Sequence, residues 1–191
     1  MRWHQRAVVR RVNRCNAVLV AVLLCSAAFL LSPAARAQGD CKIVRDALDK
    51  LTTVPSHAYE TETNPTRPDS GARSVEMITT GGAIYITING KWKKSPLSAA
   101  AMQAQQDENW KDAKNVSCKY LRDESVGGQS AAVYKTHNEN EDTKEDGQVW
   151  VSKSKGLLLR EEQDVDLGSG DKRHHSARYE YTNVQAPSVS P

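Results

Sequence analysis

The residues of this chain that could do chemistry are few, and none of them forms a known catalytic motif. His174 and His175 are adjacent, and five acidic residues crowd the segment 138–147. Neighbouring residues of a strand point to opposite faces of its sheet, so we do not expect these two imidazoles to bind one metal ion. The acids lack the spacing of a hand-type calcium loop, which favours a solvated polar loop. Since no Gly-x-Ser-x-Gly, Walker or His-Glu-x-x-His motif occurs, we expect neither an enzyme nor a bound metal or cofactor.

The first 37 residues have the three parts of a secretory signal peptide. They contain arginines but no acidic residue, then an apolar run from Ala17 to Leu31, then the small-residue exit Ala35-Arg36-Ala37. The apolar run is shorter than the ~20 residues that a membrane-spanning helix needs. We therefore expect cleavage after Ala37, a periplasmic or secreted protein, and no stable membrane span in the remaining chain.

Removal of this leader reverses the net charge. The chain has 26 basic and 23 acidic residues, and loss of the leader's six arginines leaves 20 against 23, a net charge of −3. Nucleic acid is therefore not an expected partner, because there is no excess of positive charge to neutralise phosphates. The expected organisation is a leader at 1–37, a single domain at 38–186 and a frayed tail at 187–191.

Cysteine usage fits an oxidising compartment. Cys41 and Cys118 are the only cysteines beyond the leader. Two such residues in an exported protein are expected to form one disulfide. A structural metal site would need more ligands at Cys-x-x-Cys spacing, so we favour the disulfide.

The elements that must position these residues follow from hydrophobic spacing. A helix beginning at a capping Asp40 is predicted by an apolar stripe that includes Val44, Ala47 and Leu51, and a second helix runs from Ser98 to about Ala113. Alternating segments between Ser56 and Thr182 predict about eight strands, and Asn89-Gly90 is a strong hairpin signal. Without a βαβ repeat, this order predicts an α+β fold: a curved antiparallel sheet with both helices packed on or across its concave face.

One hairpin motif resembles that of a known family. Val149-Trp150-Val151-Ser152, followed by Lys155-Gly156-Leu157-Leu158-Leu159-Arg160, is similar to the Trp–turn–Gly-Leu-Pro-x-Arg hairpin of the LolA-like and LppX-like periplasmic lipoprotein carriers. The leader, the first helix, the ordered strands and the mid-chain helix are similar as well. The resemblance implies a half-open barrel whose concave face shelters the acyl chain of a lipid or lipoprotein. The chain departs from the family pattern at Leu158-Leu159, where the carriers have Leu-Pro, and it has no Phe beyond the leader.

Two hypotheses therefore stand. In the first, the chain is a non-enzymatic binding protein with an apolar ligand in the concavity of its sheet. In the second, it is a small structural or envelope-interaction domain whose filled core holds no ligand. The candidate ligand-lining residues are Ile84, Ile86, Trp92, Tyr120, Val149, Val151, Leu157, Leu159, Tyr179 and Tyr181.

Overall fold

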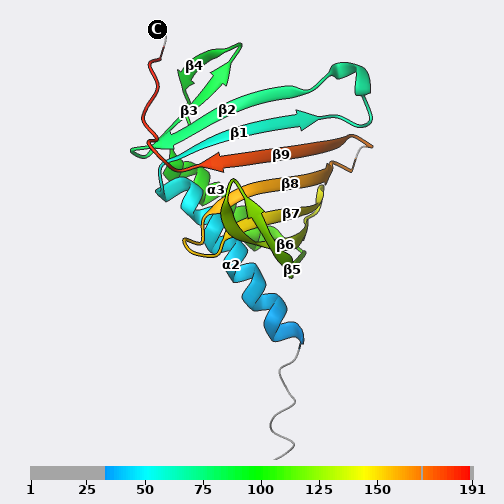
Figure 1. The fold of residues 1–191 in the computed structure, drawn as a ribbon. Coiled ribbons are helices and arrows are strands. Elements are labelled where there is room, and N and C mark those ends of the chain that lie inside the picture. Colours follow the sequence, from blue (N-terminus) through cyan, green and yellow to red (C-terminus); the bar gives the residue numbers. More distant parts are fainter. Residues whose placement is uncertain (1–32, 169, 190–191) are drawn as a thin grey trace, which may run out of the picture. The chain divides into compact units, whose positions relative to one another are not determined.

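The computed structural model describes residues 33–168 and 170–189 (Figure 1). A compact unit begins at Ala37 and contains all of the strands. Nearly all of the leader lies outside the described residues, so cleavage after Ala37 stays a prediction. Among the helices that are described, none combines the length and the apolar character needed to cross a membrane.

The strands form one antiparallel sheet, which confirms the predicted α+β fold with a curved, unclosed sheet. The order is β4-β3-β2-β1-β9-β8-β7-β6-β5, so β4 and β5 are the edges. The described chain contributes nine strands rather than about eight. Their bounds are β1 (Ser56–Thr63), β2 (Arg73–Thr80), β3 (Ala83–Ile88), β4 (Lys91–Lys94), β5 (Asn115–Val126), β6 (Gln129–Glu139), β7 (Lys144–Ser152), β8 (Leu158–Asp166) and β9 (Lys172–Glu180).

The first and last strands meet in the middle of the sheet. Ala58 of β1 lies opposite Met77 of β2 on one side and opposite Tyr179 of β9 on the other. All other neighbours in the sheet are consecutive in sequence. The β1–β9 pairing therefore joins two runs of hairpins into one surface, and it is the only long-range strand pairing that the described fold requires.

Two helices and a single 3-10 turn complete the described unit: α2 (Pro33–Thr53), α3 (Ala99–Asp112) and η2 (Pro68–Ser70). Ser98 caps α3 as predicted, because its Oγ accepts a hydrogen bond from the Ala101 backbone N–H at 3.1 Å. The predicted cap at Asp40 is wrong, since α2 is already helical from Pro33. Asp40 instead accepts a hydrogen bond from the backbone N–H of Tyr120 on β5, at 3.0 Å.

The predicted acidic loop at 138–147 is also wrong. Strand β6 continues to Glu139 and β7 begins at Lys144, so only four residues form the turn. Asn140 closes this turn, because its Oδ1 accepts hydrogen bonds from the backbone N–H groups of Asp142 and Thr143. On the strands, the carboxylate of Asp146 is bound by His137 at 2.9 Å. Pairing of this kind allows charged residues to occupy a strand that composition alone assigns to a loop.

Buried side chains form two clusters, one on each face of the sheet. Alternation along β7 places Val149 and Val151 in the main core under α2, while Trp150 joins a second, smaller cluster on the opposite face. The second cluster also contains Ala131, Val133 and Leu159. The face under α2 is called the inner face below, and the face that carries Trp150 is called the outer face.

Candidate binding groove

Helix α2 is fastened to the inner face by its apolar stripe. Val44, Ala47 and Leu51 recur at helical spacing, are buried, and pack in one cluster with sheet residues that include Tyr134 and Val149. Cys41, one turn before Val44, is bonded to Cys118 of β5, as predicted. The helix is therefore held both by apolar packing and by a covalent link to an edge strand.

Helix α3 lies against one flank of α2 and runs antiparallel to it. Gln103 donates a hydrogen bond to Asp49 Oδ1 at 2.8 Å, and Asp107 pairs with Arg45 at 2.7 Å. Moving four residues back along α2, from Asp49 to Arg45, thus corresponds to moving four residues forward along α3, from Gln103 to Asp107. The Arg45 guanidinium also lies 5.8 Å from the ring centroid of Trp110. This flank of α2 is closed by side chains.

The other flank of α2 borders an open groove of about 440 Å³. This volume falls within the ~300–1,000 Å³ that is typical of small-molecule sites. The apolar side chains that line the groove are Ile43 of α2, Tyr120 of β5, Ala132 and Tyr134 of β6, and Val151 of β7. We call this space the α2 groove.

Two apolar side chains at the α2 groove face solvent. Ile43 is 43% exposed and Tyr120 is 44% exposed, whereas Tyr134 and Val151 beneath them are buried. The rings of Tyr120 and Tyr134 meet edge to face at 5.9 Å between centroids, which holds Tyr120 beside the opening. The groove therefore has a packed apolar floor and apolar edges that a ligand could cover.

One end of the α2 groove is polar. Asp123 and Lys153 form an ion pair at 2.5 Å, and Tyr120 Oη donates a hydrogen bond to Asp123 Oδ1 at 3.1 Å. Both contacts lower the pKa of the Asp123 carboxyl, with the hydrogen bond from Lys153 contributing most. An apolar floor beside a charged pair matches the two parts of an amphiphile.

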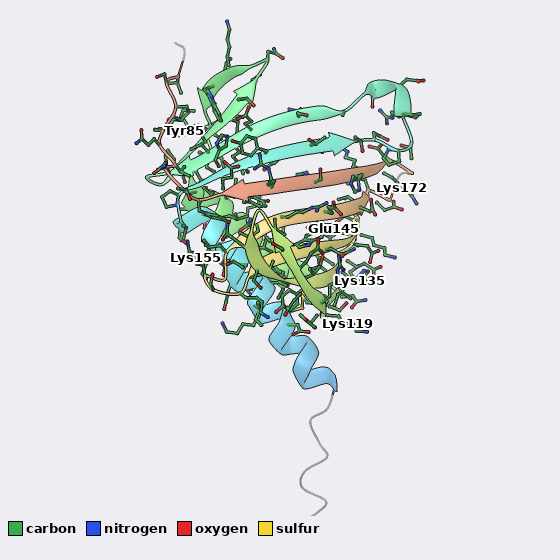
Figure 2. The ribbon with its side chains drawn as sticks, in the orientation of Figure 1. Tyr85, Lys119, Lys135, Glu145, Lys155 and Lys172 are labelled. Atoms are coloured by element: carbon green, nitrogen blue, oxygen red, sulfur yellow. A yellow bond between two sulfur atoms is a disulfide. The ribbon has the colours of Figure 1, made fainter. Side chains whose placement is uncertain are left out.

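Gly156 shapes the boundary of the α2 groove beside the β7–β8 turn. It has a φ of +60°, and a Cβ there would lie 2.9 Å from Lys50 Nζ. That ammonium donates to the backbone oxygens of Lys155 and Gly156, each at 3.0 Å. Figure 2 shows Lys155 at this turn, at the end of the sheet where α2 finishes. The Lys50 contact joins the helix to the turn.

A smaller cavity, of about 90 Å³, lies on the α3 side of α2. It is lined by residues that include Leu48, Trp110 and Glu145, and the last of these is labelled in Figure 2. Burial raises the pKa of the Glu145 carboxyl. This volume lies well below the usual range for a ligand site, so the cavity is the weaker candidate.

Acidic side chains occupy the centre of the inner face. Glu161 of β8 is only 8% exposed, and Tyr179 Oη donates to its Oε2 at 3.4 Å. His175 Nε2 lies 3.9 Å from its other carboxylate oxygen. Burial, and after it the charge of Glu60, raises the pKa of Glu161 to about 7. The hydrogen bond from Tyr179 opposes this rise, and the charge of Glu145 adds a smaller increase. This part of the inner face is polar and suits an acyl chain less well than the α2 groove does.

The structure brings only two of the ten candidate lining residues, Tyr120 and Val151, together at the α2 groove. Val149 and Tyr179 lie in the main core, and Ile84 and Leu157 are also buried. Tyr181 donates a hydrogen bond to the backbone oxygen of Leu158 at 2.6 Å. Ile86 is half-buried on β3, opposite Met77.

Leu159 and Trp92 lie on the outer face. Leu159 packs against Trp150, because a bulge in the β7–β8 pairing places Leu158 opposite Val151 and Arg160 opposite Trp150. Trp92 contacts the ring of His57, whose neighbour Ala58 belongs to the inner core. The lining role of these two residues stays a prediction, and the α2 groove does not depend on it.

Sequence reasoning missed Ile43, Ala132 and Tyr134 as groove residues. Ile43 lies at the edge of the apolar stripe of α2. Its angular position around the helix, away from the buried Val44, Ala47 and Leu51, was a signal that it borders the groove. Ala132 and Tyr134 share one face of β6 by alternation. Nothing in the sequence showed that this face of β6 lies beside α2, because only the folded sheet brings the two together.

Each histidine of the described residues lies beside a different acidic residue. His174 binds Asp164 at 2.8 Å on the outer face, while His175 points to the inner face, as expected for neighbours on a strand. His57 binds Glu76 at 2.9 Å and His137 binds Asp146. Among the described residues, none of these imidazoles hydrogen bonds to a Ser, Thr or Cys side chain, which is the contact that a histidine-activated nucleophile needs.

Comparison with known proteins returns similarities of fold. No family model and no curated protein matches the chain. The solved structures that resemble it include lipoprotein LppX of Mycobacterium tuberculosis, at 14% identity over 75% of this chain and 97% of that chain, with a TM-score of 0.42. LprF from Mycobacterium bovis is similar at 9% identity over 81% and 98% of the two chains, with a TM-score of 0.44. MucB, in complex with MucA(peri), is similar at 10% identity over 78% and 57%, with a TM-score of 0.43.

LppX, to whose group the hairpin motif is similar, is thus also among the structurally similar proteins, at a low TM-score. The identities are 9% to 14% and the TM-scores 0.42 to 0.44. They leave the choice of ligand and partner to the residues of this chain.

Proposed function

We propose that the chain is an exported, non-enzymatic binding protein that shelters the acyl chain of a lipid in the α2 groove. The observation that carries the proposal is the pairing of solvent-facing Ile43 and Tyr120 above a buried apolar floor, in a space of about 440 Å³. Folding normally buries such side chains against one another, so an open apolar trough beside a packed core favours a ligand.

The polar end of the groove supports an amphiphile rather than a pure hydrocarbon. Each CH₂ group moved out of water stabilises the complex by about 0.8 kcal/mol. The Asp123–Lys153 pair supplies a charged group of each sign at one end, where a lipid headgroup would face water. The free energy of binding thus comes from burial of the acyl chain, and the headgroup fixes the orientation of the lipid in the groove.

Export and the absence of catalysis belong to the same proposal. The leader-like first 37 residues and the Cys41–Cys118 bond both suit an oxidising compartment outside the cytoplasm. The histidines of the described chain are each engaged by an acid, and nothing marks a nucleophile beside one of them.

The alternative is a structural domain without a ligand, and one observation favours it. Six of the ten candidate lining residues are buried against other side chains of the protein. If the α2 groove were also closed in solution, this alternative would hold. The six residues are Ile84, Val149, Val151, Leu157, Leu159 and Tyr179.

Binding of a fluorescent fatty acid, such as dansylated undecanoic acid, distinguishes the two. We expect saturable binding by the wild type and a loss of at least tenfold in Ile43→Glu, because a carboxylate would then project into the apolar trough. Val189→Glu is the matched control, since it makes the same change at another exposed aliphatic residue that does not line the groove. Equal binding by both variants, or no binding by the wild type, would favour the structural domain.

A further inference from the structure

We propose that the β3–β4 hairpin and the segment that follows it dock the protein on membrane surfaces that contain anionic phospholipid. This unit, Ala83–Leu97, is called the basic hairpin below. The proposal is independent of the α2 groove, because it concerns a different edge of the sheet and needs no bound ligand. It would stand even if the groove were empty.

The first observation is the segregation of charge. From Met77 to Gln106 the chain has no Asp or Glu, yet it contains Lys91, Lys93 and Lys94. All 23 acidic residues lie outside this stretch, in a chain that is net acidic beyond residue 37. Glu76, the last acid before the stretch, is bound by His57 at 2.9 Å. The lysines therefore form a local positive region on an otherwise acidic domain.

The second observation is that these lysines are free and exposed. Within the part of the chain that the structure describes, none of the three makes an ion pair. Strand β4 is an edge strand that pairs only with β3, and Figure 1 shows the hairpin at the end of the sheet remote from β5. Nothing in the described unit neutralises this charge.

The third observation is the apolar surface between the lysines. Ile88, at the turn, is 41% exposed and Leu97 is 37% exposed. Trp92 and Tyr85 are half-buried, and Tyr85 is labelled on this part of the sheet in Figure 2. Aromatic and basic side chains beside exposed aliphatic ones are the composition that the interfacial layer of a bilayer favours.

The arrangement of these residues favours a membrane over an acidic protein. Lys91 and Lys93 lie opposite Ile88 and Ile86 on the inner face, whereas Lys94 lies opposite Tyr85 on the outer face. Positive charge and apolar surface thus occur on both faces of the hairpin. A protein partner would cover one face, but a hairpin tip that enters the headgroup layer is surrounded on both sides.

The turn geometry suits entry by the tip. Asn89 and Gly90 have φ values of +52° and +71°, so the turn is tight and has no bulky side chain at its end. Ile88 and Lys91 flank it as a direct cross-strand pair. An aliphatic side chain can therefore enter the interface while the neighbouring ammonium binds a phosphate.

Vesicle binding tests the proposal with the exported protein. We expect it to cosediment with vesicles of phosphatidylcholine and phosphatidylglycerol, but not with phosphatidylcholine alone. Each lysine near an anionic surface changes partitioning by about fivefold. The combined Lys91→Gln, Lys93→Gln and Lys94→Gln variant is therefore expected to bind on the order of 100-fold more weakly.

The matched control removes three lysines elsewhere. Lys111, Lys119 and Lys135 are exposed, and Figure 2 shows the last two on β5 and β6. Their triple replacement by Gln makes the same change in net charge, so retained binding supports the hairpin as the docking site. Ile88→Ser separately tests the apolar contact and should weaken binding at high salt, where the lysine contribution is screened.

Two results overturn the proposal. An equal loss in both lysine triples would show that net charge alone drives binding. Failure of the wild type to bind anionic vesicles would assign the lysines to an acidic protein partner instead. A fatty-acid-binding defect in Ile43→Glu without a vesicle-binding defect would confirm that the two sites are separate.

Discussion

Cys41 of α2 is bonded to Cys118 of β5, the strand at one edge of the sheet. The neighbouring Asp40 accepts the backbone N–H of Tyr120 at 3.0 Å, two residues further along the same strand. These two links attach the helix to the strand beside the α2 groove. The hydrogen bond to Asp40 also satisfies one N–H group of the edge strand that would otherwise lie open to pairing with another chain.

Removing this bond is expected to destabilise the protein. The disulfide spans 77 residues, and the loop-entropy estimate for such a loop is about 4 kcal/mol, which is an upper value for Cys41→Ala with Cys118→Ala. Urea unfolding of the double variant and of the oxidised wild type measures the difference. Coincident unfolding midpoints, or two reactive thiols in the unreduced, unfolded wild type, would contradict the expectation.

Glu161 is expected to make the protein less stable as the pH rises from 4.5 to about 7. Its folded-state pKa of about 7 lies above the ordinary 4.5, so the folded state holds the proton while the unfolded state releases it. The free energy of unfolding falls across this window by on the order of 3 kcal/mol and is flat on either side, as far as this group is concerned. Unfolding curves measured at several pH values test the sign directly.

Replacement of that carboxyl isolates its contribution. Glu161→Gln should remove most of the slope and raise stability above pH 7, where the wild type must keep a buried charge. Glu162→Gln is the matched control, because its carboxylate lies on the outer face and pairs with Arg160. A pH slope that survives unchanged in Glu161→Gln would contradict the assignment.

Gly147 is expected to tolerate no side chain. A Cβ at this position would overlap the backbone oxygen of Glu162 and lie 2.9 Å from Cγ of Gln163. Gly147→Ala should therefore cost about 1–3 kcal/mol, as overpacking typically does. Chemical denaturation of this variant beside Gln148→Ala, an adjacent change on the opposite face, measures the cost. Equal stability of the two variants would show that β7 and β8 can separate to admit a methyl group.

Local signals predicted much of this fold because their physical causes are local. Asn89-Gly90 predicted a tight hairpin, and both residues have the positive φ that such a turn requires. Ser98 predicted the start of α3, and its side chain makes the capping hydrogen bond. The alternation of β1, β2 and β3 likewise predicted their extents.

The failures came where distant contacts decide the structure. Pairing of β1 with β9 joins residues such as His57 and Glu180, and no local pattern encodes that choice. Composition predicts a loop over 138–147, where β6 ends and β7 begins, because it shows the acids there without partners such as His137. Asp40 has the residue type of a helix cap, but its carboxylate accepts a hydrogen bond from a strand.

The candidate site was predicted less completely than the fold. Alternation separates inner from outer residues along β7, but the bulge in the β7–β8 pairing places Leu159 on the outer face, against that pattern. Alternation also does not show which inner residues a helix covers. Tyr120 and Val151 border the α2 groove, while Val149 and Tyr179 are buried in the core. The position of α2 makes this difference, and it results from packing over the whole sheet.

The most direct test of the central claim is mass spectrometry of an organic extract of the protein recovered from its native envelope. The acyl-binding account predicts a lipid at near-stoichiometric amount in the wild type and in Val189→Glu, and a strongly reduced amount in Ile43→Glu. An extract of the wild type that contains no lipid, or equal lipid in all three proteins, would contradict it.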